Sequence, residues 1–200
     1  MKILIACEFS GRVRDAFLNK GHYAISVDLL PTESIRGDKE KILCSDKNFH
    51  ELFTHFQGNI LDFLDYNFDM MLAFPPCTHL SVSGARWFAE KQADGRQQLA
   101  IAFFMALVNA PFKKIMIENP IGIMSTYYRR PDQIIQPWQF GHGETKATCL
   151  WLKNLPFLKP TCIVEGRSHS IHTMGPSENR GKLRSLTYQG IADAMAEQWG

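Results

Sequence analysis

Short apolar runs recur along the first 120 residues, and each one ends at a polar or turn-forming residue. Segments with apolar residues three or four positions apart lie between them, which is the spacing of a helix face. The strands that this pattern predicts cover residues 2–7, 23–28, 70–74 and 113–119, with a short strand or turn at 58–61. Strands that alternate with helices predict an α/β fold, a doubly wound and mostly parallel sheet.

Helical spacing appears in four places. The predicted helices follow Gly11, run through residues 49–56, cover residues 85–109 with a break near Gly95, and occupy residues 190–199. The second half of the 85–109 segment is expected to bury one face, which carries Leu99, Phe103, Ala106 and Leu107. After Pro120 a strand is predicted at 147–152, and residues 156–184 are mostly loop. No repeat or linker is evident, so residues 1–200 are predicted to form a single domain.

Composition narrows the class of protein without naming an activity. An apolar fraction of 45% and a charged fraction of 21% are typical of a soluble globular protein. A net charge of +2 neither indicates nor excludes a nucleic-acid partner, because a basic cleft can lie on a nearly neutral protein. No run approaches the ~20 apolar residues of a membrane span. The five scattered cysteines form no Cys-x-x-Cys pair or zinc spacing, so we expect no metal site and a reducing, cytoplasmic location.

Candidate chemistry lies where two of the predicted strands end. The run from Met70 to Phe74 stops at Pro75 and Pro76 and is followed at once by Cys77. An inert, buried thiol is one interpretation of this cysteine. The next predicted strand ends at Glu118, which Asn119 and Pro120 follow. Because doubly wound folds place their sites at the carboxyl ends of strands, we expect the thiol and the carboxyl to lie at one edge of the sheet.

The first strand and turn favour a nucleotide-like cofactor. Phe9, Ser10 and Gly11 form a tight turn, although its single glycine falls short of a dinucleotide fingerprint. Asp28 ends the second strand, where a carboxylate can accept both hydrogen bonds of a ribose diol; a loop aspartate or helix cap is the alternative. No P-loop lysine motif is present. A cofactor with a ribose and little phosphate recognition therefore fits best.

Taken in order, these motifs resemble those of the cytosine-C5 DNA methyltransferases. The Pro-Cys pair at 76–77 and the Glu-Asn pair at 118–119 stand in the family's order, and residues 9–11 resemble its first cofactor motif. Residues 58–60, Gly-Asn-Ile, correspond to a Gly-Asp-Ile that contacts the adenine, and residues 188–196 resemble the last family motif. The resemblance covers most of the first 120 residues and the C-terminus.

The resemblance implies a fold, a cofactor and a set of site residues. The fold would be the Rossmann-like one of S-adenosylmethionine-dependent methyltransferases, and the substrate a DNA cytosine flipped out of the helix. Cys77 would add to cytosine C6 with a lowered pKa, and Glu118 would bind the base. The remaining expected contacts are those to the cofactor, by Phe9, Ser10, Gly11, Asp28, Asn59 and Pro75, and those to the substrate, by Asn119, Lys146 and Thr148.

The sequence departs from the family pattern at three points. Asn59 replaces the usual aspartate, and the family's arginine motif is represented only by Arg129 and Arg130 or by residues 146–148. A short loop-rich segment, about 152–186, replaces the large target-recognition region, so recognition is small, absent or supplied by a separate partner. The basic residues of this segment could contact phosphates, or they could simply be solvated side chains of a surface loop. They are Arg167, His169, His172, Arg180, Lys182 and Arg184. We expect a compact protein of phage or prophage type.

Two other interpretations stay open. The chain could modify C5 of a free pyrimidine nucleotide or of a single strand, which would account for the missing recognition region. It could also be a catalytically weak module that binds the cofactor or nucleic acid, an interpretation that Asn59 supports and that Cys77 and Glu118 oppose.

Overall fold

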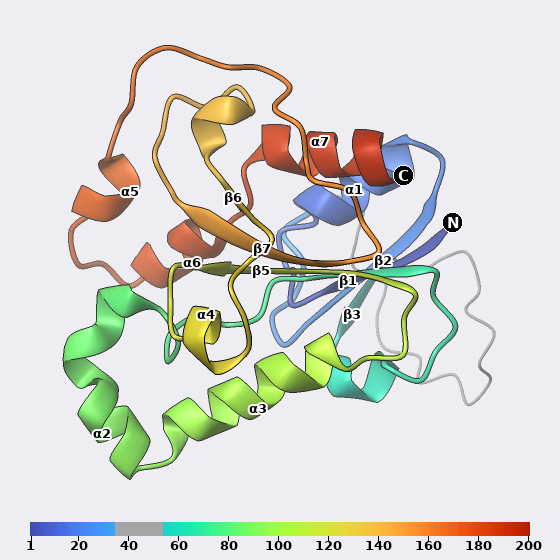
Figure 1. Cartoon of the computed structure of the whole chain (residues 1–200). Helices are drawn as coiled ribbons and strands as arrows, with labels where there is room; N and C mark the ends of the chain where they lie inside the picture. The colour runs from blue at the N-terminus through green and yellow to red at the C-terminus, as the bar shows by residue number, and fades with distance from the viewer. Residues whose placement is uncertain (35–53) are drawn as a thin grey trace.

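The computed structural model describes residues 1–34 and 54–200, which build one seven-stranded sheet (Figure 1). The strand order is β3-β2-β1-β4-β5-β7-β6. Strands β1 to β5 pair in parallel, whereas β7 runs antiparallel between β5 and β6. The bounds are β1 (Lys2–Ala6), β2 (Tyr23–Asp28), β3 (His55–Gln57), β4 (Met70–Ala73), β5 (Lys114–Pro120), β6 (Gln133–Ile135) and β7 (Thr148–Lys153). This order confirms the predicted Rossmann-like, mostly parallel fold of the methyltransferase type.

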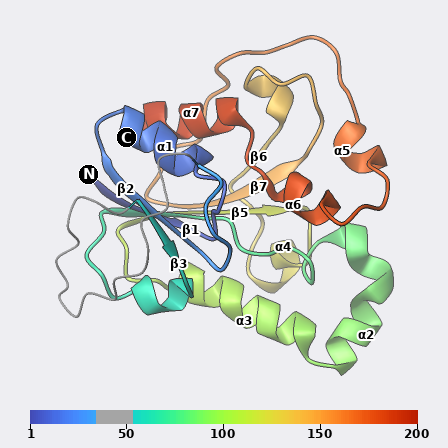
Figure 2. The same cartoon turned by 180° about the vertical axis from the view of Figure 1, so that it is seen from behind.

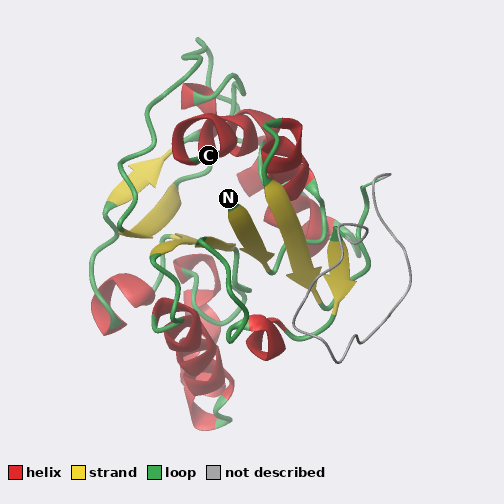
Figure 3. Cartoon of the chain, turned by 90° about the vertical axis from the view of Figure 1, so that its right-hand side faces the viewer, coloured by secondary structure: helices red, strands yellow, loops and turns green. Residues whose placement is uncertain are grey.

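Helices cover both faces of the sheet (Figure 2). One face carries α1 (Arg12–Asn19) and α7 (Gln189–Trp199), which pack against each other, and the opposite face carries α3 (Arg96–Val108). Figure 3 shows the strands between these helix layers. The remaining described helices are short, and they are η1 (Ile60–Phe63), η2 (Val82–Trp87), α2 (Phe88–Ala93), α4 (Met124–Tyr127), η3 (Pro137–Gln139), α5 (Ser170–Thr173) and α6 (Arg180–Ser185).

The central strands are apolar on both sides because each side is covered. Ile3 and Ile5 pack with α1 and α7, while Leu4 and Ala6 pack with Phe104 of α3. These four residues of β1 are fully buried. Continuous apolar runs of this kind are typical of parallel strands that helices cover on both faces. The same feature makes these strands the easiest elements to predict.

Two local predictions are wrong. The third strand is His55–Gln57, so Phe56 is in a strand rather than a helix; residues 49–53 of that predicted helix lie outside the described residues. Leu99 is 73% exposed, and Phe104 takes the buried position, with its ring 5.3 Å from that of Trp151. The face that α3 buries is set by where the sheet lies. The predicted break at Gly95 is confirmed, because this residue has a φ of 81° and caps α3.

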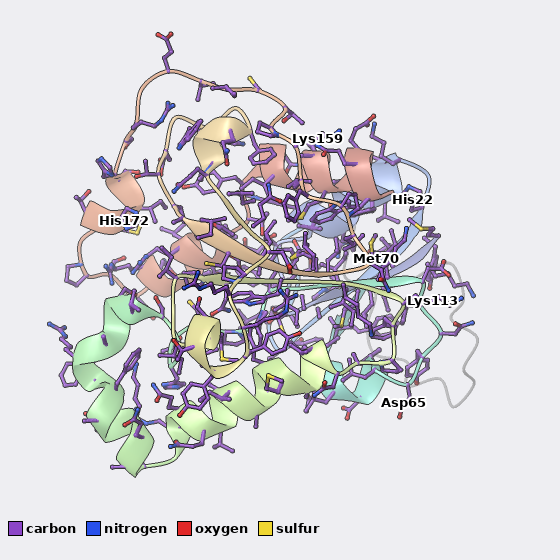
Figure 4. The ribbon with its side chains drawn as sticks, in the orientation of Figure 1. His22, Asp65, Met70, Lys113, Lys159 and His172 are labelled. Atoms are coloured by element: carbon purple, nitrogen blue, oxygen red, sulfur yellow. The ribbon has the colours of Figure 1, made fainter. Side chains whose placement is uncertain are left out.

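The carboxyl ends of β1 to β5 meet at one edge of the sheet, called the carboxyl edge below. In β4 and β5, Ala73 pairs with Ile117, so the residues that follow leave the sheet side by side. Figure 4 labels Met70 and Lys113 at the amino ends of these strands, and His172 on α5 beyond the carboxyl edge. The topology thus brings the Cys77 and Glu118 segments together as expected.

Candidate functional site

Backbone and side-chain hydrogen bonds join the segment after β4 to the segment after β5. The Asn119 side-chain amide donates to the carbonyl oxygen of Pro75 at 2.9 Å. The backbone N–H of Ile123 donates to the carbonyl oxygen of Leu80 at 2.9 Å. A Cβ at Gly122 would lie 2.4 Å from that same oxygen, so only glycine allows the approach. The two segments are therefore held as one unit, and the Oδ1 of the buried Asn119 side chain has no hydrogen-bond partner among the described residues.

Cys77 sits in a tight turn at the carboxyl edge. Its carbonyl oxygen accepts from the backbone N–H groups of Leu80 at 3.0 Å and Ser81 at 2.9 Å. Burial raises the pKa of the Cys77 thiol, and the negative charge of Glu118 raises it further, while Lys146 and Arg184 lower it. The expected lowering of this pKa is therefore wrong. Basic groups are present, but desolvation and the neighbouring carboxylate outweigh them.

The pKa values of Cys77 and Glu118 are linked. Burial also raises the pKa of Glu118, and the positive charge of Lys146 opposes that rise. Two anions close together in a poorly solvated site disfavour each other. Burial therefore favours the neutral form of both groups, and a charged Glu118 makes ionisation of Cys77 still less favourable. A protonated Glu118 no longer opposes ionisation of Cys77.

Glu118 faces a small cavity at the carboxyl edge. No described residue donates a hydrogen bond to its carboxylate. The cavity has a volume of about 20 Å³, room for one water molecule. Its walls come from the ends of β4, β5 and β7, from α7 and from the segment that precedes α7, and they comprise Phe74, Glu118, Lys146, Thr148, Ser185, Thr187, Tyr188, Ile191 and Met195. Two residues predicted as substrate contacts, Lys146 and Thr148, thus lie beside Glu118.

Residues 180–188, called the strap below, cross the carboxyl edge over this cavity. The Lys146 ammonium donates to the carbonyl oxygen of Arg184 at 2.8 Å. The Arg12 guanidinium donates to the carbonyl oxygen of Thr187 at 2.7 Å. The Tyr188 hydroxyl donates to Glu144 at 2.9 Å. Lys146 is therefore bound to the strap and is the basic group nearest Glu118. Arg129, the other candidate for the arginine motif, is bound to Asp132 and to the carbonyl oxygen of Leu152, away from this edge.

The turn after β1 is tightly packed. Phe9 is buried, with the Lys182 ammonium 5.4 Å from its ring centroid. Ser10 donates to Glu8 at 2.5 Å. Gly11 has a φ of 75°, and a Cβ there would lie 2.5 Å from the Cβ of Ser34. The fold itself therefore demands this glycine.

The other predicted cofactor residues lie at the ends of β2, β3 and β4. Asp28 accepts from the backbone N–H of Leu30 at 2.9 Å, and burial raises its pKa. Asn59 is exposed and its side-chain oxygen accepts from the backbone N–H of Leu61 at 3.1 Å, which caps η1. Pro75 is buried. Together with residues 9–11, they follow four neighbouring strands along the carboxyl edge.

The groups at this edge fit a cofactor that carries positive charge and a ribose. Glu8 is 4% exposed, and its Oε2 has no hydrogen-bond partner. An unpartnered buried carboxylate oxygen is costly unless a donor reaches it. Asp28 offers a second carboxylate. The ammonium and the ribose hydroxyls of S-adenosylmethionine are donors of the required kind, so the residues present fit this group.

Sequence reasoning missed the residues that hold the Cys77 turn from the other side. Lys91 is buried, and its ammonium donates to the carbonyl oxygen of Thr78 at 2.6 Å. The Gln97 side chain donates to the carbonyl oxygen of His79 at 3.2 Å. Polar residues in an exposed-looking helical stretch give no signal of this role, because their partners lie far away in sequence.

Comparisons with known proteins find a likeness among solved structures but not among families or curated proteins. No family model matches the chain, and no curated protein does. A crystal structure described as a "putative DNA modification methyltransferase encoded within prophage Cp" of E. coli has 19% sequence identity and a TM-score of 0.46. The match covers 82% of this chain, which spans about half (52%) of that one. A likeness at this level carries no conclusion about activity, which rests below on the residues of the site.

No helix in residues 1–34 or 54–200 is long and apolar enough to cross a membrane. No group of three or more metal-ligating side chains occurs in the same part of the chain.

Proposed function

We propose that this protein is an S-adenosylmethionine-dependent DNA methyltransferase that acts on C5 of cytosine. The observation that carries the proposal is that Cys77 and Glu118 stand at the ends of adjacent parallel strands, where the charge of Glu118 acts on the Cys77 thiol. Asn119 and Gly122 join the two segments, so the fold holds the backbone on both sides of the site together.

A thiol and a protonated carboxyl are what the chemistry at cytosine needs. C5 is a poor nucleophile, and addition of the Cys77 thiolate at C6 makes it an enamine-like carbon. Glu118 would donate to N3 of the base as the electron pair moves there. When bound, S-adenosylmethionine supplies an electrophilic methyl group for C5. A base then removes the C5 proton, the double bond reforms, and the thiolate leaves.

The raised pKa values suit this division of roles. Burial keeps Glu118 protonated at higher pH, as a donor to N3 requires. Neutral Glu118 removes the charge that opposes the Cys77 thiolate, and the positive charges of Lys146 and Arg184 favour that thiolate. The proton on the carboxyl and the charge on the sulfur thus support each other.

The partner would be DNA whose target base leaves the stack. Inside a duplex the ring faces are covered, so the base must flip out to meet a thiol. Glu8 and Asp28 would hold the cofactor's ammonium and ribose, with Phe9, Ser10, Gly11, Asn59 and Pro75 around them.

Transfer of labelled methyl groups to cytosine-rich DNA tests the proposal. We expect the wild type to label DNA and Cys77→Ala to label none. Cys162→Ala is the matched control, because this free cysteine is exposed and lies outside the site. Transfer that persists in Cys77→Ala would refute the mechanism. DNA that contains 5-fluorocytosine should trap the wild type as a covalent adduct, visible on a denaturing gel.

A free pyrimidine nucleotide is the second candidate substrate. One observation favours it: residues 154–187 contribute only two short helices, α5 and α6, among their described elements. Competition separates the candidates. Unlabelled dCMP or dCTP should leave DNA labelling unchanged if DNA is the substrate, and should suppress it if the nucleotide is.

A further inference from the structure

The segment that follows the Cys77 turn projects from the molecule and exposes an aromatic side chain. This segment comprises η2 and α2, residues 82–93, and is called the arm below. Figures 1 and 2 both show α2 at an outer corner of the molecule, beyond the carboxyl edge. Trp87 on the arm is 49% exposed. Tryptophan is on average a highly buried residue, so its exposure here calls for a reason.

An exposed arginine lies against this tryptophan. The guanidinium carbon of Arg86 lies 5.1 Å from the Trp87 ring centroid. Arg86 is exposed and forms no ion pair with a described residue, whereas Arg96 nearby is bound to both Glu90 and Asp94. An exposed aromatic ring beside an exposed guanidinium without an ion-pair partner among the described residues is a combination that binds unpaired bases and their phosphates.

The arm is fixed to the nucleophile. Trp87 follows Cys77 by ten positions, and the Lys91 ammonium ties the arm to the carbonyl oxygen of Thr78 at 2.6 Å. Lys91 is the only buried residue of α2, so this bond is the main anchor of the helix. A polynucleotide extends past the base that reacts, and its neighbouring nucleotide can meet the arm. A free nucleotide has no neighbouring nucleotide to place on the arm.

We propose that the arm binds single-stranded DNA or another unpaired stretch, with Trp87 stacked on a base beside the target and Arg86 on a phosphate. The proposal deepens the proposed function and rests on it for the identity of the target base. It commits the site to a polymer and assigns the arm as its second contact.

Binding without cofactor tests the proposal separately from methyl transfer. The probe is a fluorescein-labelled single-stranded oligonucleotide of about 12 cytosine-containing nucleotides, followed by anisotropy. Trp87→Ala should raise the Kd about fivefold to a hundredfold, and Trp87→Phe should raise it less, because a phenyl ring still stacks. Arg86→Gln should weaken binding and flatten its salt dependence. The matched controls are Leu99→Ala, at a 73% exposed position, and Lys153→Gln, at an exposed position at the far end of β7, and both should bind as the wild type does.

Three outcomes would overturn the proposal. They are a wild type that binds no oligonucleotide, a Trp87→Ala variant that binds as the wild type does, and an equal loss in Leu99→Ala. Failure of the proposed function looks different. The oligonucleotide would still bind through Trp87, but no methyl group would reach cytosine.

Discussion

The thiol of Cys77 and the carboxyl of Glu118 form one electrostatic pair. Burial is the main reason why the Cys77 pKa is raised, and the Glu118 charge is the second. Replacing Glu118 by glutamine keeps the volume and removes the charge. We therefore expect Glu118→Gln to lower the Cys77 pKa, so that the thiolate forms at lower pH than in the wild type.

The rate at which iodoacetamide alkylates Cys77, measured by peptide mass spectrometry between about pH 6 and 10, reports this pKa, because only the thiolate reacts. The midpoint should move to lower pH in Glu118→Gln and stay in place in Glu178→Gln, a change at an exposed carboxyl. An unmoved midpoint in Glu118→Gln would show that the two groups are not coupled.

At the scale of single residues, the sequence predicts which residues belong to the site better than it predicts their burial and their contacts. Cys77 and Glu118 could be found because each follows an apolar run and a proline marks the boundary. The direction of the Cys77 pKa shift could not be predicted, because it depends on how far the effect of burial outweighs the positive charges of Lys146 and Arg184. Nor could the role of Asn119, whose partner Pro75 lies 44 positions away.

At the scale of elements, the strands that could be predicted from the sequence are those that helices cover on both faces of the sheet. The apolar runs of β1, β2, β4 and β5 are long enough to stand out. Strand β6 has three residues, and one of them, Ile134, is 51% exposed, so it leaves no pattern. The antiparallel direction of β7 depends on the path of the chain between β5 and β7. Periodicity contains no information about that path.

Helix α2 is predicted to position the Cys77 turn through Lys91. In Lys91→Met the carbonyl oxygen of Thr78 loses its donor, while removal of a buried charge offsets part of the cost. We expect the free energy of unfolding to change by no more than about 1 kcal/mol and methyl transfer to fall roughly 10- to 100-fold, because small displacements of a nucleophile are costly. Thermal unfolding and label transfer measure the two effects.

Lys153→Met is the control for that variant, since this lysine is exposed and far along β7 from the site. If Lys91→Met transferred methyl groups at the wild-type rate, the turn would not depend on its anchor. A large drop in melting temperature would instead mark Lys91 as a residue of the core.

On the scale of the whole molecule, the N-terminal and C-terminal parts of the chain contact each other at the carboxyl edge. Helix α7 packs on α1, and the strap in front of α7 is bound by Arg12 from the N-terminal half and by Lys146 from the C-terminal half. The cavity beneath it, about 20 Å³, does not hold a pyrimidine ring. A base that reaches Glu118 therefore requires the strap to move, and the bonds that hold the strap set how often it opens.

The Arg12 bond gives the sharpest test of this opening. Its guanidinium donates to the Thr187 carbonyl oxygen at 2.7 Å, and a hydrogen bond from a charged donor contributes about 1.5–3 kcal/mol. Loss of this bond in Arg12→Gln should therefore open the strap about 10- to 150-fold more often, because each 1.4 kcal/mol is a factor of ten. We expect trypsin to cleave after Lys182 and Arg184 faster when the strap is open, so their cleavage should speed up in Arg12→Gln. Arg130→Gln removes an exposed arginine elsewhere and should leave the rate unchanged. Equal rates in Arg12→Gln and the wild type would mean that the strap is held by its other contacts, with Lys146 the first to be examined.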